Sequence, residues 1–174
     1  MALTTHKITP CLWFDSEAEE AAKFYVSVFK NSKLGKKNSN LGKISRYGKA
    51  GQEIHGKKPG SVMVAEFEID GQPFVALNGG PQFKFSEAVS FQVHCDTQEE
   101  IDYFWNALTK DGREQPCGWL KDKFGVSWQI VPTMLGKMMT DPDNKKTQRV
   151  TDAFLKMKKF DLAKLRQAYE GQAA

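Results

Sequence analysis

Two stretches of the chain place apolar residues three and four positions apart, which is the spacing of one face of an α-helix. Each stretch follows a capping box of the Ser/Thr-x-x-Glu type, at residues 16–19 and 97–100. The pattern predicts two similar helices, each burying one face. Their apolar residues correspond at an offset of 80 positions: Ala21, Phe24, Tyr25 and Val28 in the first, and Ile101, Phe104, Trp105 and Leu108 in the second.

Segments with alternating apolar and polar residues flank each helix, as expected for β-strands. Asp70-Gly71 predicts a tight turn between two of them. The order of one strand, a helix and then further strands occurs twice. This order predicts an α+β fold class with β-α-β-β-β modules at residues 7–80 and 86–132. The predicted strands are 8–14, 43–47, 61–69 and 73–77 in the first module, and 88–94, 117–120 and 126–131 in the second.

Residues 133–174 form a predicted helical extension. A short helix is expected at 133–139. Asp141 as N-cap and Pro142 at the first helical position predict a second helix that runs to about Lys159. Asp161 is the predicted cap of a last helix. These helices either cover a sheet edge or contact a partner subunit.

The strand positions opposite the apolar rows carry neutral polar and aromatic side chains rather than charges. Such a mixture suits a partly dry concavity in which neutral groups orient a ligand. An ordinary solvated sheet face and a dimer contact are the alternatives, and each aromatic residue has plain packing as its alternative; Trp128 is expected in the core. The candidate ligand-binding residues are Thr9, Cys11, Trp13, Phe74, Asn78, Ser90, Gln92 and Trp119, with Gln129 as a further orienting group.

His94 lies in a predicted strand and shares a face with Gln92. Histidine is the side chain best suited to proton transfer near neutral pH. If the chain is an enzyme, His94 and Gln129 are the candidate catalytic residues, in proton-transfer or oxyanion roles. A structural histidine and a nucleophilic Cys11–His94 pair are the alternatives.

Composition narrows the class of protein. Of 174 residues, 40% are hydrophobic and 26% charged, which is typical of a globular protein. The net charge is +4, but the basic residues do not form a stripe interleaved with aromatic residues, so no nucleic-acid partner is expected.

No segment is apolar enough to span a membrane, and the first residues lack the apolar run of a secretion signal. We therefore expect a cytoplasmic protein. Cys11, Cys95 and Cys117 are too widely spaced for a disulfide framework or a zinc knuckle.

Three motifs resemble those of a known family. They are Phe24-Tyr25-Val26-Ser27-Val28-Phe29, then Leu77-Asn78-Gly79-Gly80-Pro81, and then Gly118-Trp119 followed by Asp122 and Phe124-Gly125-Val126-Ser127-Trp128-Gln129. Over about residues 7–132 the chain resembles PhnB-like proteins of the vicinal-oxygen-chelate superfamily, which includes glyoxalases, bleomycin-resistance proteins and dioxygenases. This group is often named 3-demethylubiquinone-9 3-methyltransferase.

The resemblance implies that the paired modules curl into a mixed sheet with the helices outside, around a ligand cavity, and that the chain forms a homodimer. Many relatives hold a divalent metal at four positions, which fall here on Thr9, Ala76, Ala88 and Gln129. Alanine has no ligating atom, so we expect neither a metal site nor another cofactor. Gly79-Gly80-Pro81 predicts a turn, and no glycine-rich motif for S-adenosylmethionine is evident.

Two functions remain open at this stage. The first is a metal-independent protein that binds a small molecule. The second is an enzyme on the same scaffold that acts on a small oxygenated or quinone-like substrate. Fold alone does not separate them, because one scaffold hosts unrelated chemistries.

Overall fold

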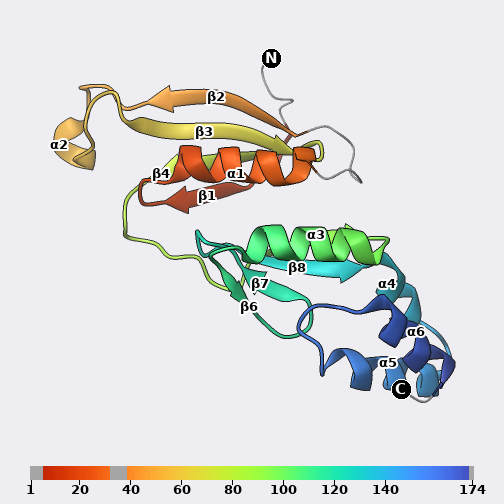
Figure 1. Cartoon of the computed structure of the whole chain (residues 1–174). Coiled ribbons are helices and arrows are strands. Elements are labelled where there is room, and N and C mark those ends of the chain that lie inside the picture. Colours follow the sequence, from red (N-terminus) through yellow and green to blue (C-terminus); the bar gives the residue numbers. More distant parts are fainter. Residues whose placement is uncertain (1–5, 32–38, 173–174) are drawn as a thin grey trace. The chain divides into compact units, whose positions relative to one another are not determined.

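The structure is a computed structural model that describes residues 6–31 and 39–172 (Figure 1). The chain divides into two compact units, residues 1–84 and 85–174, and each is described here by itself. Among the described residues, none of the helices has the length and apolar character needed to cross a membrane.

The first unit contains a four-stranded mixed sheet with strand order β1-β4-β3-β2. The strands are β1 (Cys11–Phe14), β2 (Asn40–Arg46), β3 (Val62–Ile69) and β4 (Gln72–Asn78). β1 and β4 are parallel, whereas the other pairs are antiparallel. The predicted turn between β3 and β4 is confirmed, with Asp70 and Gly71 both at positive φ. Helix α1 (Ala18–Asn31) packs along one face of this sheet, and the short α2 (Gln52–His55) lies between β2 and β3.

The core of the first unit lies between α1 and the sheet. Tyr25 of α1 stacks on Phe67 of β3, which in turn stacks on Phe74 of β4, with ring centroids 5.8 and 5.2 Å apart. The prediction that Phe74 lines a ligand face is therefore wrong. Both residue rows of β4 are largely apolar, so alternation alone did not reveal which row faces the helix. Val75 and Leu77 occupy the opposite, open face.

The start of α1 differs from the predicted Ser16 capping box. Its first backbone N–H, that of Ala18, donates to Asn78 Oδ1 at 2.8 Å. The Ser16 N–H instead bonds the Glu17 carboxylate, and Glu19 pairs with Lys23. The helix is thus capped from β4 rather than by a neighbour in sequence.

The second unit repeats this architecture, with strand order β5-β8-β7-β6 and β5 parallel to β8. The strands are β5 (Ser90–Cys95), β6 (Arg113–Glu114), β7 (Trp119–Lys121) and β8 (Ser127–Pro132). Helix α3 (Gln98–Thr109) covers one face of the sheet (Figure 1). Its predicted capping box is confirmed, since Thr97 and Glu100 cap each other reciprocally. The four predicted residues of its apolar face are buried.

The extension forms α4 (Thr133–Met139), α5 (Asn144–Phe154) and α6 (Leu162–Glu170). Asp143, rather than Asp141, caps α5, because the Asp143 carboxylate accepts the Lys145 N–H, and this helix ends before Lys159. The predicted cap of α6 at Asp161 is confirmed. α5 and α6 pack against each other (Figure 1).

Backbone hydrogen bonds join the extension to its own sheet. The N–H groups of Cys117 and Gly118 donate to the carbonyls of Met157 and Lys158, at 2.8 and 2.7 Å. These bonds join the extension to the second unit of its own chain. Its two predicted roles, covering a sheet edge and contacting a partner subunit, stay predictions.

Candidate functional site

The face of the second sheet opposite α3, called here the open face, brings together five of the residues predicted for the site. Gln92 of β5 lies opposite Gln129 of β8, which lies opposite Trp119 of β7. Ser90 and His94 flank Gln92 on the same strand, two residues away on either side. Residues directly opposite on neighbouring strands share a face, as do alternate residues along one strand. The sequence alternation therefore predicted this part of the face correctly.

Hydrogen bonds connect three of these side chains into a polar row. Gln129 Nε2 donates to Ser90 Oγ at 2.8 Å, and Gln92 Nε2 donates to Gln129 Oε1 at 3.3 Å. The first bond fixes the orientation of the Gln129 amide. Among the described residues, neither Gln92 Oε1 nor the hydroxyl hydrogen of Ser90 has a hydrogen-bond partner, so the row presents one acceptor and one donor.

Trp119 forms an apolar wall beside this row. The residue is half-buried and follows Cys117 and Gly118, which both adopt positive φ. A side chain at Gly118 would overlap the ring of Phe160, so glycine permits the close turn that brings β7 onto the sheet. The turn places the indole directly across the ladder from Gln129.

His94 is exposed at the far end of the face. Its direct partner across the ladder is Val131. Gln129, two residues before Val131 on β8, is its diagonal neighbour. The structure thus puts the two predicted catalytic residues on one face, on neighbouring strands.

The other end of the open face is charged. Arg113 of β6 lies opposite Lys121 of β7, which lies opposite Ser127 of β8. Glu87, from the segment before β5, pairs with Lys121 at 2.9 Å. Hydrogen bonding from Lys121 lowers the pKa of Glu87 to about 2. None of these residues was among the predicted site residues, although Lys121 continues the two-residue alternation that begins at Trp119.

The first sheet has its own open face, which carries Cys11, Trp13, Val75 and Leu77. The Trp13 indole donates to the Gly80 carbonyl at 2.8 Å. Much of the Cys11 surface is exposed, but surrounding groups partly desolvate its thiol and raise its pKa above the ordinary value. A raised pKa keeps a thiol protonated, which does not suit a nucleophile. Thr9 precedes β1.

Asn78, by contrast, faces α1 and serves the fold. Its side chain is only 5% exposed. It accepts from Ala18 and donates from Nδ2 to the Val62 carbonyl at 3.1 Å, while its backbone oxygen accepts from the Tyr47 hydroxyl. The prediction that Asn78 orients a ligand does not fit this placement, because the oxygen and the nitrogen of its side-chain amide both bond the unit's own backbone.

The four positions where relatives hold a metal do not fit one here. Ala76 is buried on the α1 face of its sheet, and Ala88 is exposed before β5; neither side chain has a donor atom. Across residues 6–31 and 39–172, no three His, Cys, Asp or Glu side chains gather as a metal site requires. That the chain works without a metal stays a prediction.

The aspartate of the third motif, Asp122, is structural as well. The buried carboxylate of Asp122 accepts the backbone N–H groups of Phe124 and Val126, at 2.9 and 3.0 Å, and the indole N–H of Trp128 at 2.8 Å. Trp128 is 3% exposed, which confirms its predicted place in the core. The motif therefore builds the turn that leads into β8.

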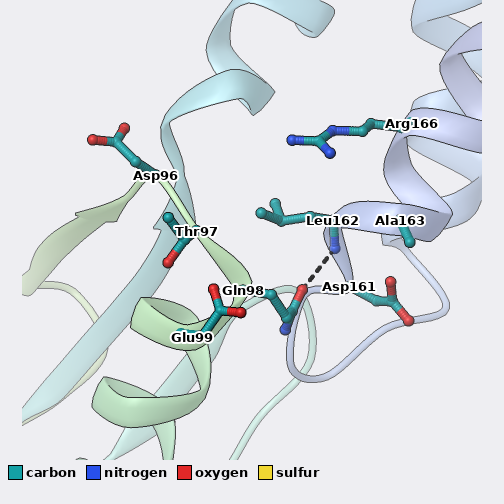
Figure 2. A pocket seen from close by; sticks show the side chains of 8 residues that line it. All are labelled: Asp96, Thr97, Gln98, Glu99, Asp161, Leu162, Ala163 and Arg166. Atoms are coloured by element: carbon teal, nitrogen blue, oxygen red, sulfur yellow. Dashed lines mark hydrogen bonds between the residues drawn. The ribbon is translucent and has the colours of Figure 1, made fainter.

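A pocket of about 350 Å³ lies elsewhere in the second unit, between the start of α3 and the start of α6 (Figure 2). Gln98 crosses it: Oε1 accepts the Leu162 N–H at 2.9 Å, and Nε2 donates to the Phe160 carbonyl at 3.1 Å. Thr97 and Asp161 in its lining are helix caps. This pocket is the joint where α6 docks, and none of the predicted site residues lines it.

These units define an α+β protein of two similar modules, each a four-stranded mixed sheet covered by a helix. The profile of the 3-demethylubiquinone-9 3-methyltransferase family matches residues 6–131, and the chain belongs to this PhnB-like family. The chain is similar to a putative 3-demethylubiquinone-9 3-methyltransferase, PhnB protein, from Bacillus cereus. The two are 36% identical, with a TM-score of 0.61, over 74% of this chain and 100% of the other.

Two further solved structures are similar at lower identity. Protein PA1353 from Pseudomonas aeruginosa is 20% identical with a TM-score of 0.55, over 74% of this chain and 98% of that one. A glyoxalase/bleomycin resistance protein from Albidiferax ferrireducens T118 is 12% identical with a TM-score of 0.43, over 73% and 98% of the two chains. No curated protein matches this chain.

Proposed function

We propose that this chain is a metal-independent protein that binds a small, neutral, oxygenated molecule on the open face of the second sheet. The observation that carries the proposal is the hydrogen-bonded row of Gln92, Gln129 and Ser90 with Trp119 beside it. A hydroxyl or carbonyl on the ligand would pair with the row, and a flat ring would lie against the indole.

The neutral character of the row supports a neutral ligand. Amide and hydroxyl groups that already bond one another lose little orientational freedom when a ligand arrives. Each new hydrogen bond contributes about 0.5–1.5 kcal/mol, and burying neutral groups avoids the larger desolvation cost of a charge. Two such bonds and a stacked ring give a modest affinity that does not depend on a metal.

The proposal does not include methyl transfer. A site for S-adenosylmethionine commonly uses a glycine-rich turn, and the candidate here is Gly79-Gly80. In the first unit this turn packs on Trp13: the ring lies where a side chain at Gly79 would be, and its N–H bonds the Gly80 carbonyl. The glycines therefore serve a close approach within the unit.

Titration with hydroquinone, a flat neutral diol, tests the binding face. In ¹H–¹⁵N spectra we expect shifts at the side-chain amides of Gln92 and Gln129 and at the Trp119 indole. Gln129→Ala should weaken binding at least tenfold because it removes the centre of the row. Gln148→Ala, an exposed glutamine on α5, is the matched control and should bind as the wild type does. Equal affinities of the two variants, or shifts confined to other regions, would contradict the proposal.

The second candidate is an enzyme on the same face, which the position of His94 beside the row favours. His94→Ala separates the two once a ligand is known. An enzyme should lose turnover while binding stays within threefold, whereas a binding protein should show a small change in affinity and have no turnover to lose. His6→Ala, an exposed histidine in the first unit, is the control.

The proposal extends to the protein's assembly and location: a homodimer in the cytoplasm, with no nucleic-acid or membrane partner. Light scattering after size-exclusion chromatography should give twice the 19.6 kDa chain mass. A monomer mass across micromolar concentrations would contradict the dimer, and recovery of the native protein in a membrane fraction would contradict the location.

A further inference from the structure

Three donors converge on one carboxylate oxygen at the charged end of the open face. Glu87 Oε1 lies 2.9 Å from Lys121 Nζ, 3.1 Å from Gln115 Nε2 and 3.8 Å from the Arg113 guanidinium. Gln115 lies across the ladder from Trp119, to which its backbone is bonded. The donors thus belong to β6, to β7 and to the residue that directly follows β6, while Glu87 lies outside the helices and strands.

Lys121 is the most buried of the three charged side chains in this cluster. Its side chain is 21% exposed, compared with 44% for Glu87 and 67% for Arg113, which faces Lys121 across a strand pair. A surface ion pair between two flexible side chains contributes little to stability. Here the two cationic side chains belong to paired strands, whereas the exposed carboxylate of Glu87 belongs to a segment outside the helices and strands.

Two orphaned polar atoms border the same cluster. Within the described part of the chain, the buried side-chain polar atoms that lack a hydrogen-bond partner are Ser127 Oγ and Gln115 Oε1. Ser127 is 1% exposed and stands opposite Lys121 on the open face. An unsatisfied buried hydroxyl is costly and calls for an explanation. A hydroxyl beside a bound anion could donate to it.

We propose that Lys121, Arg113 and Gln115 form a carboxylate subsite and that Glu87 occupies it as an internal stand-in. A ligand that carries a carboxylate displaces Glu87 and takes the same donors, with Ser127 as a further donor. This inference goes beyond the proposed function, because the subsite is formed by residues other than the neutral row and stands without it. The subsite adjoins the row at Ser90 and Trp119.

The attachment of Glu87 to the same chain determines how tightly the subsite is expected to bind a free anion. A carboxylate attached to the same chain competes at an effective concentration in the millimolar range or above, so the wild-type chain binds free anions weakly. Replacing Glu87 by its neutral isostere removes the competitor and leaves the donors unpaired. Such unpaired cations bind anions more tightly.

Titration with acetate tests the inference, followed by NMR at the Gln115 side-chain amide. We expect Glu87→Gln to bind acetate at least tenfold more tightly than the wild type. Glu53→Gln, on α2 of the first unit, makes the same change of charge at an exposed site and should bind as the wild type does. Adding Lys121→Met to the Glu87→Gln variant should abolish the gain. Glu87→Ala serves as a second variant if the glutamine substitution disturbs the fold.

A parallel titration with inorganic phosphate distinguishes the two sources of anion. Tighter binding of acetate supports a carboxylate subsite, whereas preference for phosphate would overturn it in favour of a phosphate site. The inference is also overturned if Glu87→Gln binds acetate no better than Glu53→Gln. Hydroquinone added to the same samples reports on the neutral row independently, so failure of one proposal is distinguishable from failure of the other.

Discussion

Asp122 is a buried carboxylate whose oxygens accept three hydrogen bonds from the residues that follow it. It stands within the motif by which the chain resembles its family. The turn it stabilises ends at Gly125, which adopts a left-handed φ of 85°. Asp122 therefore serves the fold, by holding the turn that leads into β8.

Removing this carboxylate should destabilise the chain strongly. We expect Asp122→Ala to lower the free energy of unfolding by about 3 kcal/mol, because hydrogen bonds to a charged group contribute roughly 1.5–3 kcal/mol and buried donors lose their partner. Urea denaturation measures the change. Asp152→Ala, an exposed aspartate on α5, should stay within about 0.5 kcal/mol of the wild type. A similar effect of both substitutions would argue against the role given to Asp122.

Glu87 should make the stability of the folded chain depend on pH in the acid range. Hydrogen bonding from Lys121 lowers its pKa from 4.5 to about 2 in the folded chain. Its ionised form therefore stabilises the fold above pH 4.5, and this contribution is lost as the pH falls toward 2. Thermal unfolding should show a lower Tm for Glu87→Gln than for the wild type at pH 7. The difference should shrink below pH 4.5 and in high salt, because exposed pairs are screened. A difference that is constant from pH 7 to pH 3 would exclude this origin.

Residue alternation predicted the second sheet better than the first. On β5 one row is polar, so the side facing α3 was evident and Ser90 and Gln92 were placed correctly. On β4 both rows are largely apolar, and Phe74 was assigned to the wrong face. Asn78 was misread because its partner, Ala18, lies sixty residues earlier in the sequence, and a local pattern does not reveal such a bond.

At the scale of elements, the two main helices also show that a local sequence pattern does not reveal a contact made by a distant residue. α3 is capped by Thr97 within its own sequence, and that cap was predictable. α1 is capped by a side chain from β4, although Ser16 and Glu19 fit the same local pattern. The donor groups at a helix start accept any suitable oxygen, and tertiary packing decided which one. The turn after β4 shows a further case of packing, since Gly79 lies under the Trp13 ring.

Gly79→Ala tests this close approach. The added Cβ would overlap the indole, so the ring or the turn must shift. We expect a loss of about 1–3 kcal/mol in the free energy of unfolding, the usual cost of overpacking, together with a change in tryptophan fluorescence. Gly136→Ala in α4 is the control, because its Cβ meets open space. It should be neutral or stabilising by up to about 1 kcal/mol, since alanine favours a helix. Equal stabilities of the two variants would contradict the packing described.

For the whole molecule, the repeat of strand, helix and strands was the most informative feature of the sequence. It predicted both sheets and both covering helices, because each unit satisfies the same pattern by its own local elements. The repeat did not predict the short strand β6 or the helix α2. Two residues of strand and one turn of helix are too short to leave a periodic pattern.

Truncation before Asp141 tests the role of the extension. It removes α5, α6 and the carbonyls that receive the N–H groups of Cys117 and Gly118. We expect a lower Tm and an unchanged oligomeric state, because these contacts lie within one chain. Calorimetry and light scattering on the same sample measure both. Conversion of an oligomer to a monomer, with the Tm unchanged, would assign the extension to a subunit contact instead.

The parallel strand pairs have a consequence for the order in which each unit folds. The Val75 N–H of β4 bonds the Pro10 carbonyl across a long intervening chain, whereas β3 and β4 are joined by a two-residue turn. Closing the longer loop costs more entropy, and non-local pairs slow folding. In pulsed hydrogen exchange, the Val75 amide should therefore gain protection after the amides shared by β3 and β4; simultaneous protection would contradict this order. The hairpin then forms the template, and β1, the earliest strand in the sequence, is the last to join its sheet.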